Sequence, residues 1–196
     1  MRVLVACEFS GTVRDAFAAK GHSALSCDLL PTESPGGHYQ GGVQDLLHLQ
    51  WDLMIAHPPC TYLTVAANKW MKPEYAHRFP DRPRQRMDAI EFFMLLMNCG
   101  IPRIAVENPI GIMSSRFRKP DQVIQPWMFG HGETKATCLW LKNLPKLVAT
   151  DVVSGREQRL HKLPPSADRW KLRSKTYQGI ADAMAEQWGG LNYAYI

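Results

Sequence analysis

The sequence predicts a single α/β domain over residues 1–196, with a mostly parallel sheet and helices on both faces. Short apolar segments rich in β-branched residues alternate along the chain with segments of helical periodicity. This alternation is typical of parallel strands joined by crossover helices. The hydrophobic fraction is 45% and the charged fraction 21%, which is ordinary for a folded protein and excludes disorder or a coiled coil as the main state.

The elements can be assigned in chain order. Arg2–Cys7 is a short apolar run typical of a buried strand. Ser10–Lys20 has apolar residues at helical spacing, and Gly21 after it is typical of a helix C-terminus. The same criteria predict a strand Ser23–Leu29, a Pro- and Gly-rich loop over residues 31–42, a strand Trp51–Ala56, a helix Met87–Asn98, strands Ile104–Val106 and Thr137–Leu141, and a closing helix Thr176–Trp188.

Composition narrows the class of protein. No apolar run approaches the roughly 20 residues that a membrane helix needs. Glu8 interrupts the short apolar start of the chain, so we expect no signal peptide. The five cysteines include no CxxC pair, which argues against a disulfide framework or a zinc site. Free thiols in a reducing compartment favour a cytoplasmic protein.

Two segments concentrate the positive charge. Residues 68–86 contain six basic and two acidic residues, and residues 155–175 contain seven basic and two acidic residues. Such clustering suits an anionic partner, such as nucleic acid or a nucleotide phosphate. A pair of solvated loops explains the charge alone equally well.

Unusual residues follow the predicted strands, at the edge of an open α/β sheet where ligands bind. They are Phe9-Ser10-Gly11, Asp28, Pro59-Cys60 and Glu107-Asn108. The glycine of the first turn lets a ligand approach the backbone, and the absence of a GxGxxG pattern argues against a dinucleotide. Asp28 could accept hydrogen bonds from two ribose hydroxyls, or it could cap a helix or turn. The first turn and Asp28 together suggest a nucleoside-type cofactor. Asp45 is either a contact to an adenine edge or part of a surface turn.

A thiol and a carboxylate complete this edge. Pro58 and Pro59 stiffen the chain and hold Cys60 where a ligand can reach it. Glu107 follows a buried strand, and we expect burial to raise its pKa so that it can donate a proton. Together they predict a nucleophile with an acid partner.

In this order and spacing, Phe9-Ser10-Gly11, Pro59-Cys60 and Glu107-Asn108 resemble the cofactor-binding turn, the Pro-Cys nucleophile and the Glu-Asn pair of the DNA (cytosine-5)-methyltransferases. Two later segments are also similar. Glu133 and Lys135 stand where that family has a glutamine and an arginine. The segment with Gly179 and Ala181 resembles the helix that completes the cofactor pocket.

The resemblance implies a Rossmann-like fold of the S-adenosylmethionine-dependent methyltransferase type. It also implies a mechanism in which Cys60 adds to carbon 6 of cytosine and Glu107 protonates ring nitrogen 3. Carbon 5 then takes the methyl group of S-adenosylmethionine. Asn108 would orient Glu107 or the Pro-Cys loop, and Lys135 would contact a phosphate or the ring carbonyl. Residues 61–86 would be a mobile loop that closes over the base.

One departure concerns specificity. Where the family carries a large target-recognition region, this chain has only a short basic insertion over residues 142–172. We therefore expect methylation of DNA with low sequence specificity. Two alternatives stay open: methylation of a free pyrimidine nucleotide (dCMP or dCTP), and a non-catalytic relative that binds nucleic acid. No membrane partner is expected, and the oligomeric state is not predicted.

Overall fold

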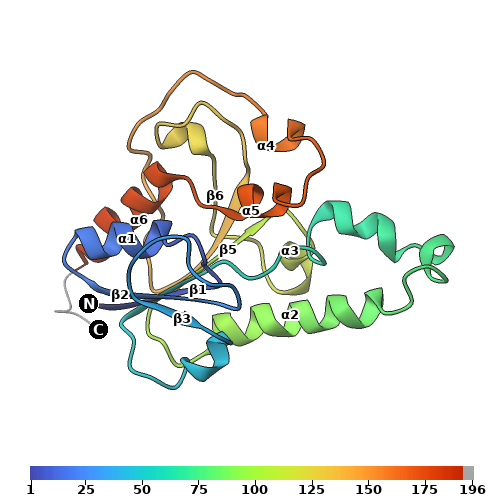
Figure 1. Cartoon of the computed structure of the whole chain (residues 1–196), viewed down its shortest axis with the longest axis horizontal. Coiled ribbons are helices and arrows are strands. Elements are labelled where there is room, and N and C mark those ends of the chain that lie inside the picture. Colours follow the sequence, from blue (N-terminus) through green and yellow to red (C-terminus); the bar gives the residue numbers. More distant parts are fainter. Residues whose placement is uncertain (192–196) are drawn as a thin grey trace.

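The computed structural model describes residues 1–191 and is built on one twisted seven-stranded sheet (Figure 1). The strands lie in the order β3-β2-β1-β4-β5-β7-β6. Their bounds are β1 Arg2–Ala6, β2 Ser23–Asp28, β3 His38–Gln40, β4 Leu53–Ala56, β5 Ile104–Pro109, β6 Gln122–Ile124 and β7 Thr137–Lys142.

The first five strands in the chain pair in parallel, and β7 runs antiparallel to both β5 and β6. The carboxyl ends of β1, β2, β4 and β5 therefore meet at one edge of the sheet. The predicted fold class is confirmed: the chain has a Rossmann-like α/β fold with a mostly parallel sheet.

Helices cover both faces of the sheet, as predicted. On one face, α1 (Thr12–Ala19) and α6 (Gln178–Gly189) enclose a core that includes the fully buried Phe17 and Trp188. On the other face, α2 (Arg82–Asn98) covers a second core around Phe93 and Trp140, whose rings meet edge to face. Burial of large apolar side chains on both faces holds the central strands in place.

Several boundaries differ from the sequence prediction. The three-residue strands β3 and β6 were not predicted, because runs this short show no periodicity. The helix α2 begins at Arg82, before the predicted start at Met87, since its first turns are polar and carry Pro83 where proline is tolerated. Strand β5 extends through Glu107 and Asn108, which the sequence placed after the strand.

Residues 61–86, predicted as a mobile loop, form an arm that projects from the body beside α2 (Figure 1, right). The arm contains the 3-10 helices η2 (Val65–Met71) and η3 (Pro73–Tyr75). Trp70 packs edge-on against Tyr75 and Phe79, with ring centroids 5.1 and 5.4 Å away. The arm's aromatic residues therefore form a small core of their own, and the mobility of the arm stays a prediction.

The predicted insertion, residues 142–172, packs onto the segment before β7. Gly132 and Gly155 meet so closely that a Cβ at Gly155 would lie 2.7 Å from the Gly132 Cα atom. The shorter helices are η1 Val43–Asp45, α3 Met113–Arg116, η4 Pro126–Met128, α4 Arg159–Lys162 and α5 Arg169–Ser174. Within residues 1–191, no helix is long and apolar enough to cross a membrane.

Candidate active site

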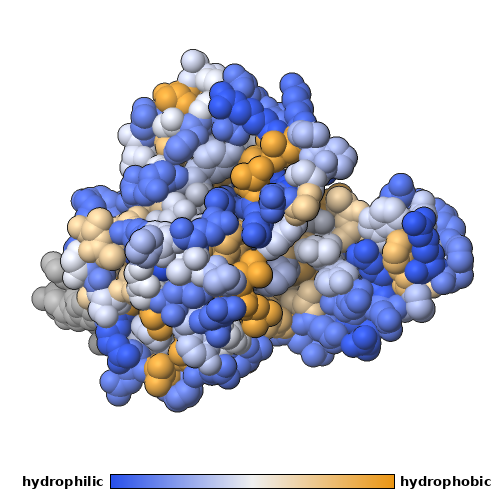
Figure 2. Space-filling view, viewed as in Figure 1, coloured by the Kyte–Doolittle hydropathy of each residue, from blue (hydrophilic) through white to orange (hydrophobic). Residues whose placement is uncertain are grey.

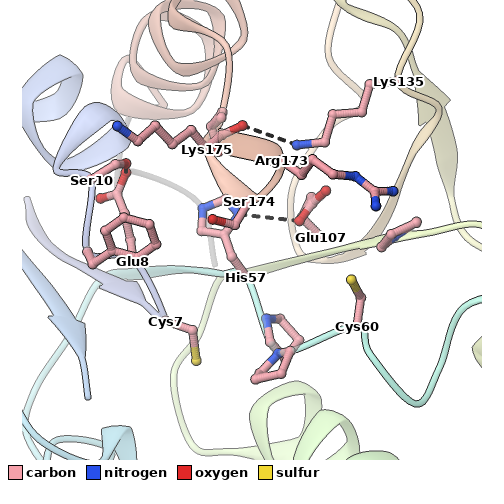
Figure 3. Close-up of a pocket in the computed structure, with 15 residues that line it drawn as sticks. Cys7, Glu8, Ser10, His57, Cys60, Glu107, Lys135, Arg173, Ser174 and Lys175 are labelled. Atoms are coloured by element: carbon pink, nitrogen blue, oxygen red, sulfur yellow. Dashed lines mark hydrogen bonds and ion pairs between the residues drawn. The ribbon is translucent and has the colours of Figure 1, made fainter. Parts of the chain in front are cut away.

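A pocket lies at the carboxyl ends of β1, β4 and β5, and the chain between α5 and α6 closes it from above (Figure 3). Polar residues that line it directly follow β1 and β4 and lie at the end of β5. Its lining consists of Cys7, Glu8, Phe9, Ser10, His57, Pro58, Pro59, Cys60, Glu107, Pro109, Lys135, Arg173, Ser174, Lys175 and Thr176. The structure thus brings together residues that lie far apart in the sequence.

Cys60 is half-buried and its sulfur points into the pocket toward Glu107 and Arg173 (Figure 3). The loop that carries it is tied to β5, because the buried Asn108 side chain donates a hydrogen bond of 2.9 Å from Nδ2 to the carbonyl oxygen of Pro58. Asn108 itself does not line the pocket. Asn108 thus links β5 to the Pro-Cys loop, and its orienting role stays a prediction.

The charges around Cys60 act in opposite directions. Burial, together with the carboxylate of Glu107, raises the pKa of the Cys60 thiol above its ordinary value. Lys135 and Arg173 lower it and so favour the thiolate. Within the described part of the chain, no carboxylate pairs with Arg173, so its charge is free to act on the pocket.

The expectation that Glu107 has a raised pKa was wrong. Burial does raise the pKa of Glu107, but contacts with His57, Lys135 and Thr137 outweigh burial and hold it below the ordinary value. The sequence argument considered only desolvation, whereas the fold places two basic side chains beside the carboxylate. Glu107 is therefore ionised in the resting site.

The basic group in contact with Glu107 is His57, the last residue before the two prolines. Its Nδ1 atom lies 3.5 Å from Glu107 Oε2, and the exposed fractions of the two side chains are 8% and 19%. The sequence analysis assigned no role to His57. Only its adjacency to the Pro-Cys motif gave any signal.

Lys135 and Glu133 point in different directions. The Lys135 ammonium enters the pocket and donates a hydrogen bond of 3.1 Å to the carbonyl oxygen of Lys175. The Glu133 carboxylate instead accepts a hydrogen bond of 2.7 Å from the hydroxyl of Tyr177. Of these two positions, only Lys135 lines the pocket, and Glu133 ties its loop to the start of α6.

The turn after β1 is poorly suited to a phosphate, because a carboxylate occupies the start of α1. Gly11 has a φ of 78°, a left-handed conformation that favours glycine. The buried Glu8 carboxylate accepts hydrogen bonds from the backbone N–H groups of Val13 and Arg14, at 2.7 and 3.2 Å. Since a carboxylate already occupies the N-terminus of α1, a phosphate would be repelled there.

The predicted cofactor residues divide into two groups. Phe9, Ser10 and Pro59 line the pocket, and Gly11 adjoins them. The other four do not line it. Asp28 Oδ1 accepts the Leu30 N–H, Asp45 accepts the hydroxyl of Tyr39, the Gly179 N–H bonds to His131, and Ala181 is fully buried in the core. Binding roles for these four stay predictions.

The segment that closes the pocket is attached to the cofactor turn. The Trp170 ring lies 6.0 Å from the ring of Phe9, centroid to centroid. Lys175 forms an ion pair of 2.5 Å with Glu33, whose backbone N–H bonds to the carbonyl oxygen of Phe9. Arg173 and Lys175, which the sequence analysis treated only as part of a basic segment, therefore belong to the site.

Cys7 is a second thiol in the pocket wall, although the sequence placed it in the core. Its φ of 59° is unusual for a residue other than glycine and turns the chain at the end of β1. Burial and the nearby Asp28 raise the pKa of Cys7 far above the ordinary range. Of the two pocket thiols, only Cys60 has cations that favour its ionised form.

The fold and the pocket together define a Rossmann-like protein with a paired thiol and carboxylate at the carboxyl edge of its sheet. No family model matches the sequence, and no curated protein matches it. Among solved structures, one similar chain is an E. coli protein described as a "putative DNA modification methyltransferase encoded within prophage". It shares 13% sequence identity and superposes with a TM-score of 0.44 over 72% of this chain and 46% of that chain. This chain thus spans about half the length of that protein.

Proposed function

We propose that this chain is an S-adenosylmethionine-dependent methyltransferase that methylates carbon 5 of cytosine in DNA through a covalent adduct of Cys60. The observation that carries the proposal is the shared pocket of Cys60 and Glu107, at the ends of neighbouring strands and beside Lys135 and Arg173. A thiol nucleophile has no use in direct attack by an exocyclic amine, which argues against methylation of an amino group.

The residues of the pocket have separate tasks in this reaction. The Cys60 thiolate adds to carbon 6 of the pyrimidine ring, which makes carbon 5 electron-rich. Glu107 faces ring nitrogen 3, where negative charge develops, and delivers a proton there. Asn108 holds the Pro-Cys loop through Pro58, and thereby fixes the position of the nucleophile.

In this proposal the cofactor would lie on the other side of the pocket. S-adenosylmethionine, when bound, supplies the methyl group that carbon 5 takes up. Phe9, Ser10 and Pro59 would hold it against the ends of β1 and β4. Asp28 would bind the ribose hydroxyls, since no hydrogen bond within residues 1–191 reaches its Oδ2 atom.

The substrate follows from the positive charge around the pocket. The arm and the insertion carry the two basic segments, and Arg173 brings one free cation to the pocket mouth. Phosphates of DNA are the anions that such surfaces bind. A second candidate, dCMP or dCTP, is favoured by the same observation on Arg173, because one guanidinium suits the phosphate of a free nucleotide.

The test is a methyl-transfer assay with labelled S-adenosylmethionine and a panel of double-stranded DNA, single-stranded DNA, RNA, dCMP and dCTP. We expect transfer of the methyl group to DNA. We also expect a covalent adduct between the enzyme and an oligonucleotide that contains 5-fluorocytosine, because fluorine blocks the final elimination. Mass spectrometry would detect this adduct at the summed mass of the two molecules.

Cys60→Ala is expected to abolish both signals and to leave cofactor binding in place. Cys99→Ala, whose thiol lies outside the pocket at the end of α2, is the matched control and keeps both signals. Full activity of Cys60→Ala would remove Cys60 as the nucleophile. A panel in which no substrate accepts a methyl group, while the protein still binds DNA, would favour a non-catalytic relative.

A further inference from the structure

His57 is a buried imidazole with no close hydrogen bond. It directly follows β4 and lines the pocket, and only 8% of its side chain is exposed. Neither ring nitrogen has a hydrogen-bond partner among the described residues. Buried polar nitrogens of this kind are uncommon and call for a functional explanation.

Glu107 is the group nearest to the imidazole. His57 Nδ1 lies 3.5 Å from Glu107 Oε2, an ion-pair distance drawn as a dashed line in Figure 3. The other polar or titratable groups that line the same two cavities come from the segments after β1 and β4, before and in β7, and between α5 and α6. They are Cys7, Glu8, Ser10, Cys60, Lys135, Thr137, Arg173, Ser174, Lys175, Thr176 and Tyr177. Glu8 is the second carboxylate among them, and it is bound to the backbone at the start of α1, so Glu107 is the carboxylate in contact with the imidazole.

The proposed reaction needs a proton that Glu107 does not hold at rest. The pKa of Glu107 lies below its ordinary value, so the carboxylate enters the reaction ionised. A proton for ring nitrogen 3 must then reach Glu107 from a neighbour. His57 is in contact with the same carboxylate, and its side chain is less exposed than that of Glu107.

We propose that His57 and Glu107 form a dyad that holds one proton, in which His57 is a positioning residue that supplies the proton through Glu107. This inference rests on the proposed function. The resemblance to the DNA (cytosine-5)-methyltransferases gave no role to His57, and this inference assigns one.

The proton transfers between the dyad and ring nitrogen 3 cancel over one turnover, and the proton of carbon 5, which the methyl group replaces, leaves to water before Cys60 is released. When Cys60 adds to carbon 6, the proton on His57 Nδ1 moves to Glu107 Oε2 and a proton moves from Glu107 to ring nitrogen 3. When Cys60 leaves, ring nitrogen 3 returns its proton to Glu107, and His57 takes it back. Contacts of this length in ligand-free enzymes commonly shorten when substrate binds.

The first test follows the Glu107 carboxyl itself, in the protein without ligands. Carbon-13 NMR of the labelled glutamate side chains reports the pKa of Glu107, assigned by its loss in Glu107→Gln. In His57→Gln we expect the pKa of Glu107 to rise, because burial remains and the main group that opposes it is gone. His38→Gln is the control, since both ring nitrogens of His38 bond within the β2–β3 region, and it leaves the titration unchanged.

The second test follows catalysis. His57→Gln is expected to lower kcat about 10²-fold near neutral pH, the scale of lost acid catalysis, with little change in KM. Its activity optimum should move to lower pH, where Glu107 acquires its own proton. His57→Asn, whose amide nitrogen occupies the place of Nδ1, should behave in the same way and serves if the Gln variant does not fold.

The outcomes separate this inference from the proposed function. An unchanged Glu107 titration in both folded variants overturns the dyad. So does a wild-type pH profile for His57→Gln in an enzyme that forms the 5-fluorocytosine adduct. If wild-type protein forms no adduct, the proposed function fails, and the proton supply to ring nitrogen 3 fails with it, whatever the titration shows.

Discussion

Cys60 and Cys7 show how the same side chain acquires different chemistry within one pocket. Both thiols are half-buried, and burial is the largest cause that raises the pKa of each. Cys60 lies near Lys135 and Arg173, which favour the thiolate, whereas Cys7 lies near Asp28 and Cys27, which oppose it. The surrounding charge therefore adds to the difference in burial and favours ionisation of Cys60 over that of Cys7.

A first prediction concerns the two cations. In the double variant Lys135→Gln with Arg173→Gln, we expect the pKa of Cys60 to rise further, because burial and Glu107 still oppose the thiolate. The rate of alkylation by iodoacetamide, followed against pH with the modified cysteine located by mass spectrometry, should shift to higher pH. Lys171→Gln, whose ammonium stacks on Trp170, is the control. If the pH profile of alkylation equalled that of the wild type, Lys135 and Arg173 would have no influence on the pKa of Cys60.

A second prediction concerns Asp28. Its free oxygen suits ribose hydroxyls, so Asp28→Ala should weaken S-adenosylmethionine binding by about 1–3 kcal/mol, the scale for hydrogen bonds to a charged group. Asp45→Ala is the comparison, because Asp45 already accepts the Tyr39 hydroxyl at 2.8 Å, and we expect a smaller loss. Calorimetry measures both affinities. Equal affinity of Asp28→Ala and wild type would take Asp28 out of the cofactor site.

At the scale of elements, strand ends and helix starts are joined by close contacts around the pocket. Asn108 of β5 holds the loop after β4, and Glu8 after β1 caps α1. The start of α6 is packed against the segment before β7, since a Cβ at Gly179 would lie 2.0 Å from the carbonyl oxygen of Phe129. These contacts hold Lys135 and the closing segment in place.

A third prediction follows from this packing. Gly179→Ala should destabilise the fold by about 1–3 kcal/mol, because the added methyl group forces the two backbones apart. Gly100→Ala is the matched control, since a Cβ there meets no atom within 4 Å. Unfolding in urea measures both. If Gly179→Ala kept full stability but lost affinity for S-adenosylmethionine, Gly179 would act on the cofactor and not through packing.

At the scale of the whole molecule, two hydrophilic projections flank a notch on the face shown in Figure 2. One is the arm of residues 61–86, and the other carries residues 142–172 above the sheet (Figure 1). Both contain basic segments. Neither has the size of an independent recognition domain, so contacts to phosphates should outnumber contacts to base edges.

A fourth prediction is therefore low sequence specificity with strong salt dependence. The logarithm of the DNA-binding constant should fall with the logarithm of salt concentration, by about 0.9 for each phosphate contacted. Bisulfite sequencing of a methylated plasmid should show modification in many cytosine contexts. A strict recognition site of about six bases or more would require a reading element that the described residues do not provide. If dCMP or dCTP were methylated faster than any DNA, the basic segments would serve to bind the phosphates of a free nucleotide.

Much of the fold was predictable because each central strand contains a short apolar run, and β4 is apolar throughout. β1, β2, β4, β5 and β7 were each predicted within a few residues, as were α1 and α6. The short edge strands β3 and β6 depend on pairing with neighbours and leave no local signal. The polar start of α2 depends on its place in the arm.

The sequence by itself determined the sheet, the side of the sheet that carries the site, and the pairing of Cys60 with Glu107, because strand hydrophobicity and the residues after each strand are local properties. Only the tertiary structure decided the lowered pKa of Glu107, the membership of His57 and Arg173 in the pocket, and the raised pKa of Cys7. Each of these depends on charges brought close by the fold from distant segments. The Coulomb energy between two groups follows their separation in space, which no spacing along the chain reports.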